Sequence, residues 1–169
     1  YNAKAVDFNN KLRLLGFKNI KQSNMRIYKQ FVHTAVTDSA VFFGEQIAEN
    51  ELYMSLIKAL RENETSILDM PYKDIYSAKE LEVIAKAKYI FFDAENEFFA
   101  LMKFRPQTKV VRLYRETFPI ECFGVEDIEY GKRSDFRLKS KIFNANCSVF
   151  PVAGKGLVSV FEKSFKNAD

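Results

Sequence analysis

The residues of this chain best suited to chemistry are Arg115 and Glu116, in a polar turn that directly follows the predicted strand 110–114. Open α/β sheets place their ligand sites just beyond the carboxyl ends of such strands. Glu116 could act as a general base if desolvation raised its pKa, although the cation beside it acts in the opposite direction. Arg115 cannot accept a proton, because a guanidinium stays protonated at any working pH. Whether the chain is an enzyme therefore depends largely on these two side chains.

A second candidate for ligand binding is the segment Gly154-Lys155-Gly156, which follows a later predicted strand. It is similar to part of a phosphate-binding loop, so Lys155 could hold a phosphate, but the Gly-x-x-x-x-Gly-Lys-Ser/Thr pattern is incomplete. A flexible turn between a strand and a helix explains the same residues. Asp69, Asp93 and Glu95 also lie at or just past strand ends, where an acid either contacts a ligand or simply caps the next element.

Several common types of site are missing from the sequence. Only Gly44 follows the first predicted strand, so the Gly-x-Gly-x-x-Gly fingerprint of dinucleotide binding is absent. His33 is the single histidine, so neither a Ser-His-Asp triad nor a histidine-rich metal site is expected. Cys122 and Cys147 are far apart and lack further metal ligands nearby, as expected for two reduced thiols. We therefore expect no cofactor and no metal.

From Asp38 onward the predicted elements alternate between strands and helices. Continuous apolar runs predict strands, and apolar residues three and four apart predict helices. Ser77 and Glu80 form a capping box at the start of one helix. Strands are expected at 39–43, 65–69, 89–92, 110–114 and 148–152, and helices at 51–60, 78–87, 97–103 and 157–165, with 125–138 partly helical. This order predicts an α/β fold: a Rossmann-like parallel sheet flanked by helices, preceded by an N-terminal helical arm.

Basic residues are concentrated in the first 36 residues, where seven Lys and Arg residues face a single acid. Apolar residues at helical spacing, interrupted near Gly16, predict two short amphipathic helices there. Such an arm either lies on an anionic membrane surface or packs on its own domain with its lysines in water. The residues that would contact the membrane are Lys11, Arg13, Lys18 and Lys21. We therefore divide the chain into a basic amphipathic arm, 1–36, and a Rossmann-like domain, 37–169.

The composition is that of a globular protein, with 47% hydrophobic and 28% charged residues. No apolar run approaches the roughly 18 to 20 residues that a spanning helix needs, and no signal peptide is recognisable. The net charge of +4 comes from the arm, which lacks a nucleic-acid-binding signature, so no nucleic acid partner is expected. We expect a cytoplasmic protein, peripheral on the inner face of the cell membrane if the arm binds there. We also expect the chain to be a piece of a longer protein.

Three segments of the chain, 41–60, 84–91 and 114–124, resemble segments of the CDP-glycerol glycerophosphotransferase family of teichoic-acid and capsule polymerases. Residues 41–60 resemble that family's opening strand, polar loop and first helix, and residues 84–91 are similar to its helix that ends before a buried strand. Tyr114-Arg115-Glu116-Thr117, followed by 119–124, resembles the signature Trp-His-Gly-Thr-Pro-Leu-Lys-Lys-Phe-Gly with one extra residue, Phe118. The resemblance extends over residues 38–165.

The resemblance implies a GT-B glycosyltransferase-like protein in which two Rossmann-like lobes face a cleft. This chain would be the N-terminal lobe, on the side of a lipid-linked polymer acceptor. A missing lobe would bind most of the CDP-alditol or other nucleotide-activated donor, so the chain alone would be inactive. The family's basic N-terminal helices touch the membrane where the acceptor resides, which would explain the basic arm.

The signature departs from the family at its catalytic position. The family's His is the expected base that takes a proton from the acceptor hydroxyl, and Arg115 stands in its place. Arg115 would instead hold a phosphate of the acceptor or donor through a two-pronged contact. Glu116 replaces Gly and is the remaining candidate base. Tyr114 keeps a large aromatic wall in place of Trp, and Thr117 completes the predicted substrate-binding set.

Three functions from different classes therefore stay open. The first is an acceptor-side lobe of a glycosyl- or alditol-phosphate transferase for teichoic acid or capsule synthesis. The second is a catalytically degenerate GT-B-like module for binding or assembly. The third is an unrelated Rossmann-like domain that binds a nucleotide or a protein.

Overall fold

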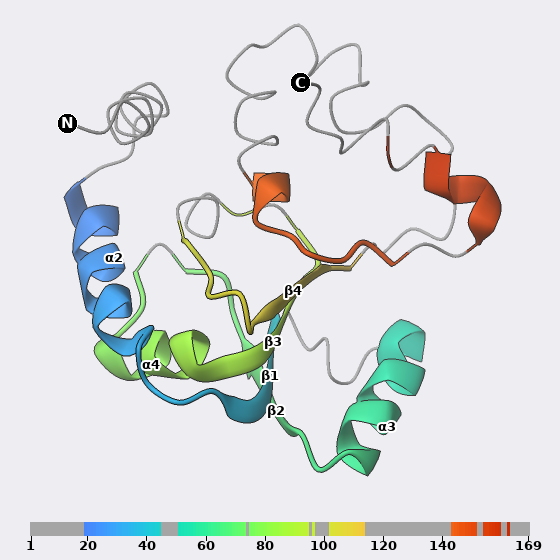
Figure 1. Ribbon diagram of the computed structural model, residues 1–169, viewed down its shortest axis with the longest axis horizontal. Coiled ribbons are helices and arrows are strands. Elements are labelled where there is room, and N and C mark those ends of the chain that lie inside the picture. Colours follow the sequence, from blue (N-terminus) through green and yellow to red (C-terminus); the bar gives the residue numbers. More distant parts are fainter. Residues whose placement is uncertain are drawn as a thin grey trace, which may run out of the picture.

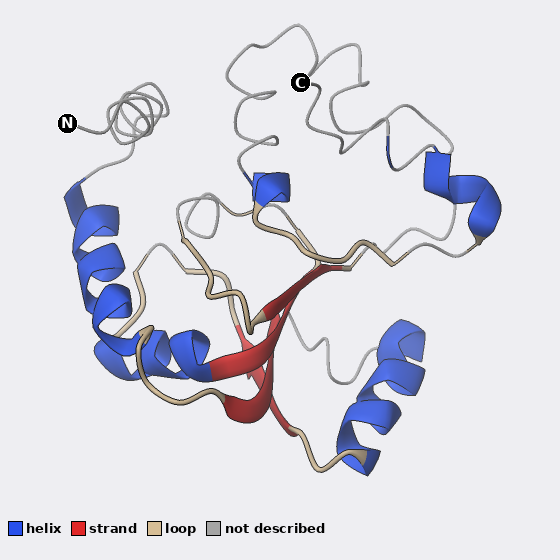
Figure 2. Cartoon of the chain, viewed as in Figure 1, coloured by secondary structure: helices blue, strands red, loops and turns tan. Residues whose placement is uncertain are grey.

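A computed structural model of the chain describes residues 19–44, 51–73, 75–94, 96, 102–113, 143–151, 154–159 and 162. Within these ranges lies a four-stranded, all-parallel sheet in the order β2-β1-β3-β4 (Figure 1). The strands are β1 Thr37–Phe43, β2 Ser66–Met70, β3 Ala87–Phe92 and β4 Lys109–Arg112. Helices cover both faces of the sheet (Figure 2), so the predicted Rossmann-like α/β fold is confirmed.

The central strands are continuous apolar runs because both of their faces are buried. Successive side chains of β1 point to opposite faces: Val41 and Phe43 belong to one core cluster, and Ala40 and Phe42 to the other. The register pairs Phe42 with Phe91 and Phe43 with Phe92. Each pair consequently stacks, with ring centroids 4.3 Å apart on one face and 5.3 Å apart on the other.

Among the described residues, the three longest helices form the outer layers. α2 Asn19–Phe31 and α4 Ala78–Lys86 lie together on one face, and α3 Met54–Glu62 lies on the other (Figure 1). A short 3-10 helix, η2 Glu51–Tyr53, precedes α3. The capping box predicted for α4 is confirmed: the Ser77 hydroxyl accepts from the Glu80 backbone N–H, and a Glu80 carboxylate oxygen accepts from the Ser77 N–H. α4 then passes straight into β3, because its C-cap residue Ala87 already has extended φ and ψ.

α2 is joined to the sheet domain by a buried polar contact and by its apolar side. The Asn24 amide donates to the Tyr76 carbonyl oxygen at 2.7 Å and accepts from the Tyr76 backbone N–H at 3.3 Å. Four residues later Tyr28 is only 1% exposed within the core. The half of the predicted arm that the structure describes therefore packs against α4, and the first predicted arm helix lies outside the described residues.

Arg105 connects the ends of both helices on this face. Its guanidinium donates to the backbone carbonyls of Phe31 and Thr34 at the end of α2, at 3.3 and 2.6 Å. It also donates to the carbonyl of Ala85, near the end of α4. Carbonyl groups at helix C-termini lack partners within the helix, and a cation is favoured there.

Two predicted elements differ from the structure. Of the predicted helix 97–103 the structure describes only Met102 and Lys103, and both are irregular rather than helical. The predicted strand 148–152 is reduced to an isolated parallel bridge between Val149 and Val111. Pro151 cannot donate to a ladder, so pairing cannot continue through it.

Candidate functional site

The candidate site is the carboxyl edge of the sheet, where all four parallel strands end on the same side. β1 leads outward to β2 on one side, whereas β3 leads to β4 on the other, so the chain reverses direction between β1 and β3. Ligands of open α/β sheets bind in the crevice at such a switch point. The residues that follow β1 and β3 there are Gly44 and Asp93.

Gly44 makes a turn that other residues would resist. Its φ is 148°, in a region that is essentially restricted to glycine, and the residue is buried. Its backbone N–H donates to the Met70 carbonyl oxygen at 3.2 Å, which ties the end of β1 to the end of β2. The backbone at the switch point is therefore held close to the neighbouring strand without a side chain between them.

Asp93 is held by a hydroxyl from the loop after β2. The Tyr72 oxygen accepts from the backbone N–H groups of Asp93 and Ala94, both at 3.1 Å. Its own proton goes to Asp93 Oδ1 at 2.9 Å, which is a shorter contact than the 3.3 Å to the Ala94 carbonyl. We call this set of contacts the Tyr72 latch. It fixes the backbone turn after β3 and one oxygen of the carboxylate.

Burial keeps the Tyr72 hydroxyl protonated and neutral. Desolvation raises the pKa of the Tyr72 phenol well above its ordinary value, so the hydroxyl remains a donor at every physiological pH. The ring packs against Phe43 at the end of β1, with centroids 6.1 Å apart. Tyr72 therefore contacts β1 through its ring and the β3 turn through its oxygen.

The rest of the loop between β2 and α4 is held by Tyr76. The Tyr76 hydroxyl accepts from the Lys73 backbone N–H at 3.0 Å and donates to the Pro71 carbonyl at 3.2 Å. Its backbone is paired with Asn24 of α2, as described above. The two tyrosines of the loop thus make different contacts. Tyr76 bonds other residues of the loop, and Tyr72 bonds the turn after β3 at the switch point.

Most of the predicted site residues lie outside the described residues. These are Tyr114, Arg115, Glu116 and Thr117, together with Lys11, Arg13 and Lys18 of the arm. The backbone of Lys21 is part of α2, but its side chain is outside the description. The last described residue before the polar turn is Leu113, which is buried and donates its N–H to the Phe92 carbonyl at 2.6 Å.

Lys155 is exposed at the start of a short 3-10 helix, η4 Lys155–Leu157. The bridge between Val149 and Val111 brings the segment that precedes Lys155 alongside β4. A Cβ added at Gly154 or Gly156 would meet no atom within 4 Å, so packing does not demand glycine at either position. Asp69 is exposed on β2, and His33 is exposed just after α2.

The sequence reasoning missed Tyr72 and weighed Asp93 only as one of several acids at strand ends. The available signal is the pair Pro71-Tyr72 directly after a strand, which by itself indicates only that the strand ends there. A partner 21 residues away along the chain could not be inferred from local pattern.

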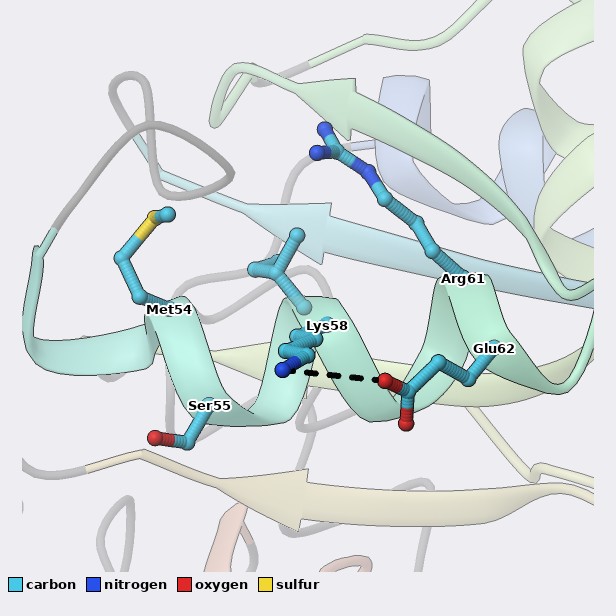
Figure 3. A pocket seen from close by; sticks show the side chains of 6 residues that line it. Met54, Ser55, Lys58, Arg61 and Glu62 are labelled. Atoms are coloured by element: carbon cyan, nitrogen blue, oxygen red, sulfur yellow. Dashed lines mark ion pairs between the residues drawn. The ribbon is translucent and has the colours of Figure 1, made fainter.

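A separate hollow of about 500 Å³ lies beside α3 (Figure 3). Its described lining residues all belong to that helix and are Met54, Ser55, Ile57, Lys58, Arg61 and Glu62. The Lys58 ammonium and the Glu62 carboxylate form an exposed ion pair at 3.8 Å. No described strand-end residue contributes to this hollow, so it is distinct from the carboxyl edge.

Two searches of the described ranges gave negative results. No three His, Cys, Asp or Glu side chains gather there as a metal site would require. No helix in those ranges is long and apolar enough to cross a bilayer.

The parallel sheet, with its switch point between β1 and β3, defines a Rossmann-like α/β domain. Comparison with protein families is more specific, because the model of CDP-glycerol:poly(glycerophosphate) glycerophosphotransferases matches residues 12–168. The chain belongs to this family, and the predicted resemblance is confirmed. The family implies an activated alditol donor and a polymer acceptor, and a role in the synthesis of cell-surface polymers. No curated protein matches the chain significantly.

Proposed function

We propose that this chain forms the acceptor-side lobe of a glycerophosphotransferase that extends a teichoic-acid or capsule polymer. The observation that carries the proposal is the family match over residues 12–168, on a domain whose described parallel strands all end at one edge. The donor, CDP-glycerol or another CDP-alditol, would be held mainly by a second lobe. By this proposal the chain alone turns over nothing, and the family membership argues against an unrelated Rossmann-like domain.

The reaction is a transfer of glycerol phosphate. The acceptor hydroxyl oxygen forms a bond to the phosphorus that bears glycerol, the bond from that phosphorus to the bridging oxygen breaks, and CMP leaves. The proton of the attacking hydroxyl must reach a base. Since Arg115 cannot take the proton, Glu116 is the proposed base. Arg115 is proposed to bind the negatively charged phosphate of the departing CMP.

Two observations support a phosphate-binding set around the polar turn. β4 ends at Arg112, so Tyr114 to Thr117 follow the carboxyl end of a strand. The bridge from Val149 to Val111 brings the segment that leads to Lys155 beside the same strand. We propose Arg115, Thr117 and Lys155 as phosphate or hydroxyl ligands, with Tyr114 as an aromatic wall.

The test uses the full-length protein with CDP-glycerol and a lipid-linked poly(glycerol phosphate) acceptor, and measures CMP release. The double variant Arg115→Ala, Glu116→Ala should lose at least about 100-fold in rate, the usual scale for a general base. The matched control is Glu82→Ala, Lys86→Ala, which removes an ion pair of the same charges from α4. Equal rates in both variants would contradict the catalytic assignment.

A second candidate function is supported by Arg115 itself. An arginine in place of the family's histidine removes the expected base, which suits a module that binds the polymer or assembles the enzyme without catalysing transfer. In that case the Arg115→Ala, Glu116→Ala protein would keep the transfer rate of the intact protein. It would instead bind the poly(glycerol phosphate) acceptor more weakly.

We also propose that the basic arm rests on the anionic inner face of the membrane through Lys11, Arg13, Lys18 and Lys21. The apolar residues of α2 from Met25 to Phe31, together with Val32 just after it, already pack on the core. This part of the arm would therefore contact lipid through its basic residues rather than through its apolar ones. Contact there would be electrostatic, and salt should weaken it.

Vesicles with and without anionic lipid test the membrane proposal. Replacing the four arm residues by Gln should abolish binding to anionic vesicles. A control variant replaces four exposed lysines elsewhere, Lys58, Lys79, Lys103 and Lys109. Equal recovery with neutral and anionic vesicles, or equal loss in both variants, would contradict the proposal.

A further inference from the structure

The helices on the two faces of the sheet differ in charge. α2, which packs on α4 on one face, has three basic residues and no acid in its thirteen positions. On the other face, η2, α3 and the turn after them, residues 51–64, hold two basic residues and three acids. An anionic surface therefore attracts the face of the domain that α2 covers more than it attracts the face with α3.

The cations of α2 lie on its outer side. Asn24 and Tyr28 are buried and mark the side that faces the domain. With 3.6 residues per turn, Arg26 lies about 180° around the helix axis from the mean direction of these two residues, and Lys29 about 120°. Both cations are exposed, and neither takes part in the ion pairs of the described residues. Their charges are therefore directed at solvent or at a partner.

Ile75 adds an apolar group beside this helix. Its side chain is 53% exposed, the largest exposure of any large apolar side chain that the structure describes. The next residue, Tyr76, has its backbone N–H and carbonyl bonded to the Asn24 amide, so Ile75 lies next to α2. A single exposed isoleucine is common on protein surfaces. Beside a helix without acids, it completes the two features by which peripheral proteins hold anionic bilayers.

The combination of groups favours a lipid surface over a soluble polyanion. A free poly(glycerol phosphate) chain has phosphates for Arg26 and Lys29, but no apolar group for Ile75. An anionic bilayer has both, because its headgroup phosphates lie directly above the acyl chains. Ile75 also follows the carboxyl end of β2, so its contact with lipid would hold the carboxyl edge of the sheet near the bilayer.

We propose that the domain docks on an anionic membrane through its α2 face, with Ile75 inserted among the lipid headgroups and with Arg26 and Lys29 bound to lipid phosphates. This inference rests on the membrane contact proposed above for the arm. It adds the face of the folded domain that meets the bilayer and the apolar side chain that enters it. α3 then points away from the membrane.

The first experiment uses tryptophan as a reporter, because the chain has none of its own. Ile75→Trp is compared with Met54→Trp, since Met54 is 50% exposed and lies at the start of α3 on the opposite face (Figure 1). On vesicles of phosphatidylglycerol and phosphatidylcholine in equal parts, emission from position 75 should shift to shorter wavelength and be quenched by brominated acyl chains. Emission from position 54 should do neither, and phosphatidylcholine alone should shift neither.

The second experiment measures the partition coefficient of the protein on the same anionic vesicles. The double variant Arg26→Gln, Lys29→Gln should lower it about tenfold or more. The matched control Lys58→Gln, Arg61→Gln removes the same two residue types from the exposed side of α3 and should leave it unchanged. Ile75→Ser should lower it about fivefold, the scale for burying half of an isoleucine side chain.

The outcomes separate this inference from the arm contact on which it rests. If the protein binds anionic vesicles while position 75 stays in water, the docking face is wrong and the arm contact stands. If replacing the four arm residues leaves binding intact while position 75 still shifts, the arm assignment is wrong and the docking face stands. Failure to bind anionic vesicles at all would overturn both. CMP release by the full-length protein enters none of these measurements, so the transferase proposal is tested separately.

Two further results would overturn the docking face. Equal shifts at positions 75 and 54 would indicate adsorption without a fixed orientation. The same shift at position 75 on adding a soluble poly(glycerol phosphate) oligomer without vesicles would make this face a polymer site instead. Circular dichroism of each variant should show an unchanged Tm, because all the altered side chains are exposed.

Discussion

Replacing Arg105 by Met should weaken the attachment of α2 to the domain. The substitution removes the guanidinium that donates to carbonyls of Phe31, Thr34 and Ala85, and keeps an apolar side chain of similar length. A net value of about 1 kcal/mol for each of these partly exposed hydrogen bonds gives a loss of about 3 kcal/mol. For a domain of this size such a loss lowers the Tm by about 6–12 °C.

The assay is thermal unfolding followed by circular dichroism, together with phenol titration. Burial raises the pKa of Tyr28 to about 12, and the nearby Arg105 charge partly opposes this rise. The Arg105→Met protein should therefore show a still higher Tyr28 pKa. Lys103→Met is the control, since Lys103 is exposed, carries the same charge and lies two residues away.

Equal melting temperatures for Arg105→Met and Lys103→Met would refute this reasoning. That result would mean that apolar packing and the Asn24–Tyr76 contact attach α2 without help from Arg105. A selective loss for Arg105→Met would instead make the second half of the arm part of the folding unit.

Four further predictions concern the described core and its caps. Ser77→Ala should cost about 1 kcal/mol in urea unfolding, because it removes the N-cap acceptor of α4. The pKa of Glu80 is lowered to about 2 by hydrogen bonds from Lys73 and Ser77, so its stabilising contribution is present above pH 4.5 and is lost as the pH falls toward 2. The stability gap between the unaltered protein and Glu80→Gln should narrow over that range, and a constant gap would contradict the assignment. Phe42→Ala should lower the unfolding free energy by about 3–5 kcal/mol, since Phe42 is fully buried and stacked, and a loss below 1 kcal/mol would contradict the two-faced core. Asn24→Ala should cost about 2 kcal/mol by stranding the buried Tyr76 backbone groups, and exchange of the Tyr76 amide should confirm the site of the loss.

The sheet could be predicted because each strand can be recognised from its own short stretch of sequence. The apolar run at 40–43 has no polar face and is too short for a helix, as expected of a strand covered on both sides, and helical spacing of apolar residues begins again at 52–60. The start of α4 was predictable for a similar reason: Ser77 and Glu80 complete the capping box within four residues.

The parts that escaped prediction depend on partners far away in the chain. Arg105 bonds carbonyls 20, 71 and 74 residues away, and no spacing rule connects them. The bridge at Val149 failed to become a strand partly because the Ser148 hydroxyl bonds the backbone N–H and carbonyl of Val110, groups that a longer ladder would use. The polar turn after β4 could be proposed as a site from sequence, but its geometry lies outside the described residues.

The direct junction of α4 and β3 fixes which side chains of the helix and which side chains of the strand face the core. With Lys86 ending the helix and Ala87 beginning the strand, no residue is available to absorb a change in length. One inserted residue would rotate the apolar face of α4 by about 100° about its axis, or exchange the two faces of β3. The first outcome would turn Ile84 away from the core, and the second would move Phe91 into the core on the other face, where its volume has no space. Length variation among relatives should therefore collect at the opposite edge of the sheet, where loops connect the elements and where partners of different size must be accommodated.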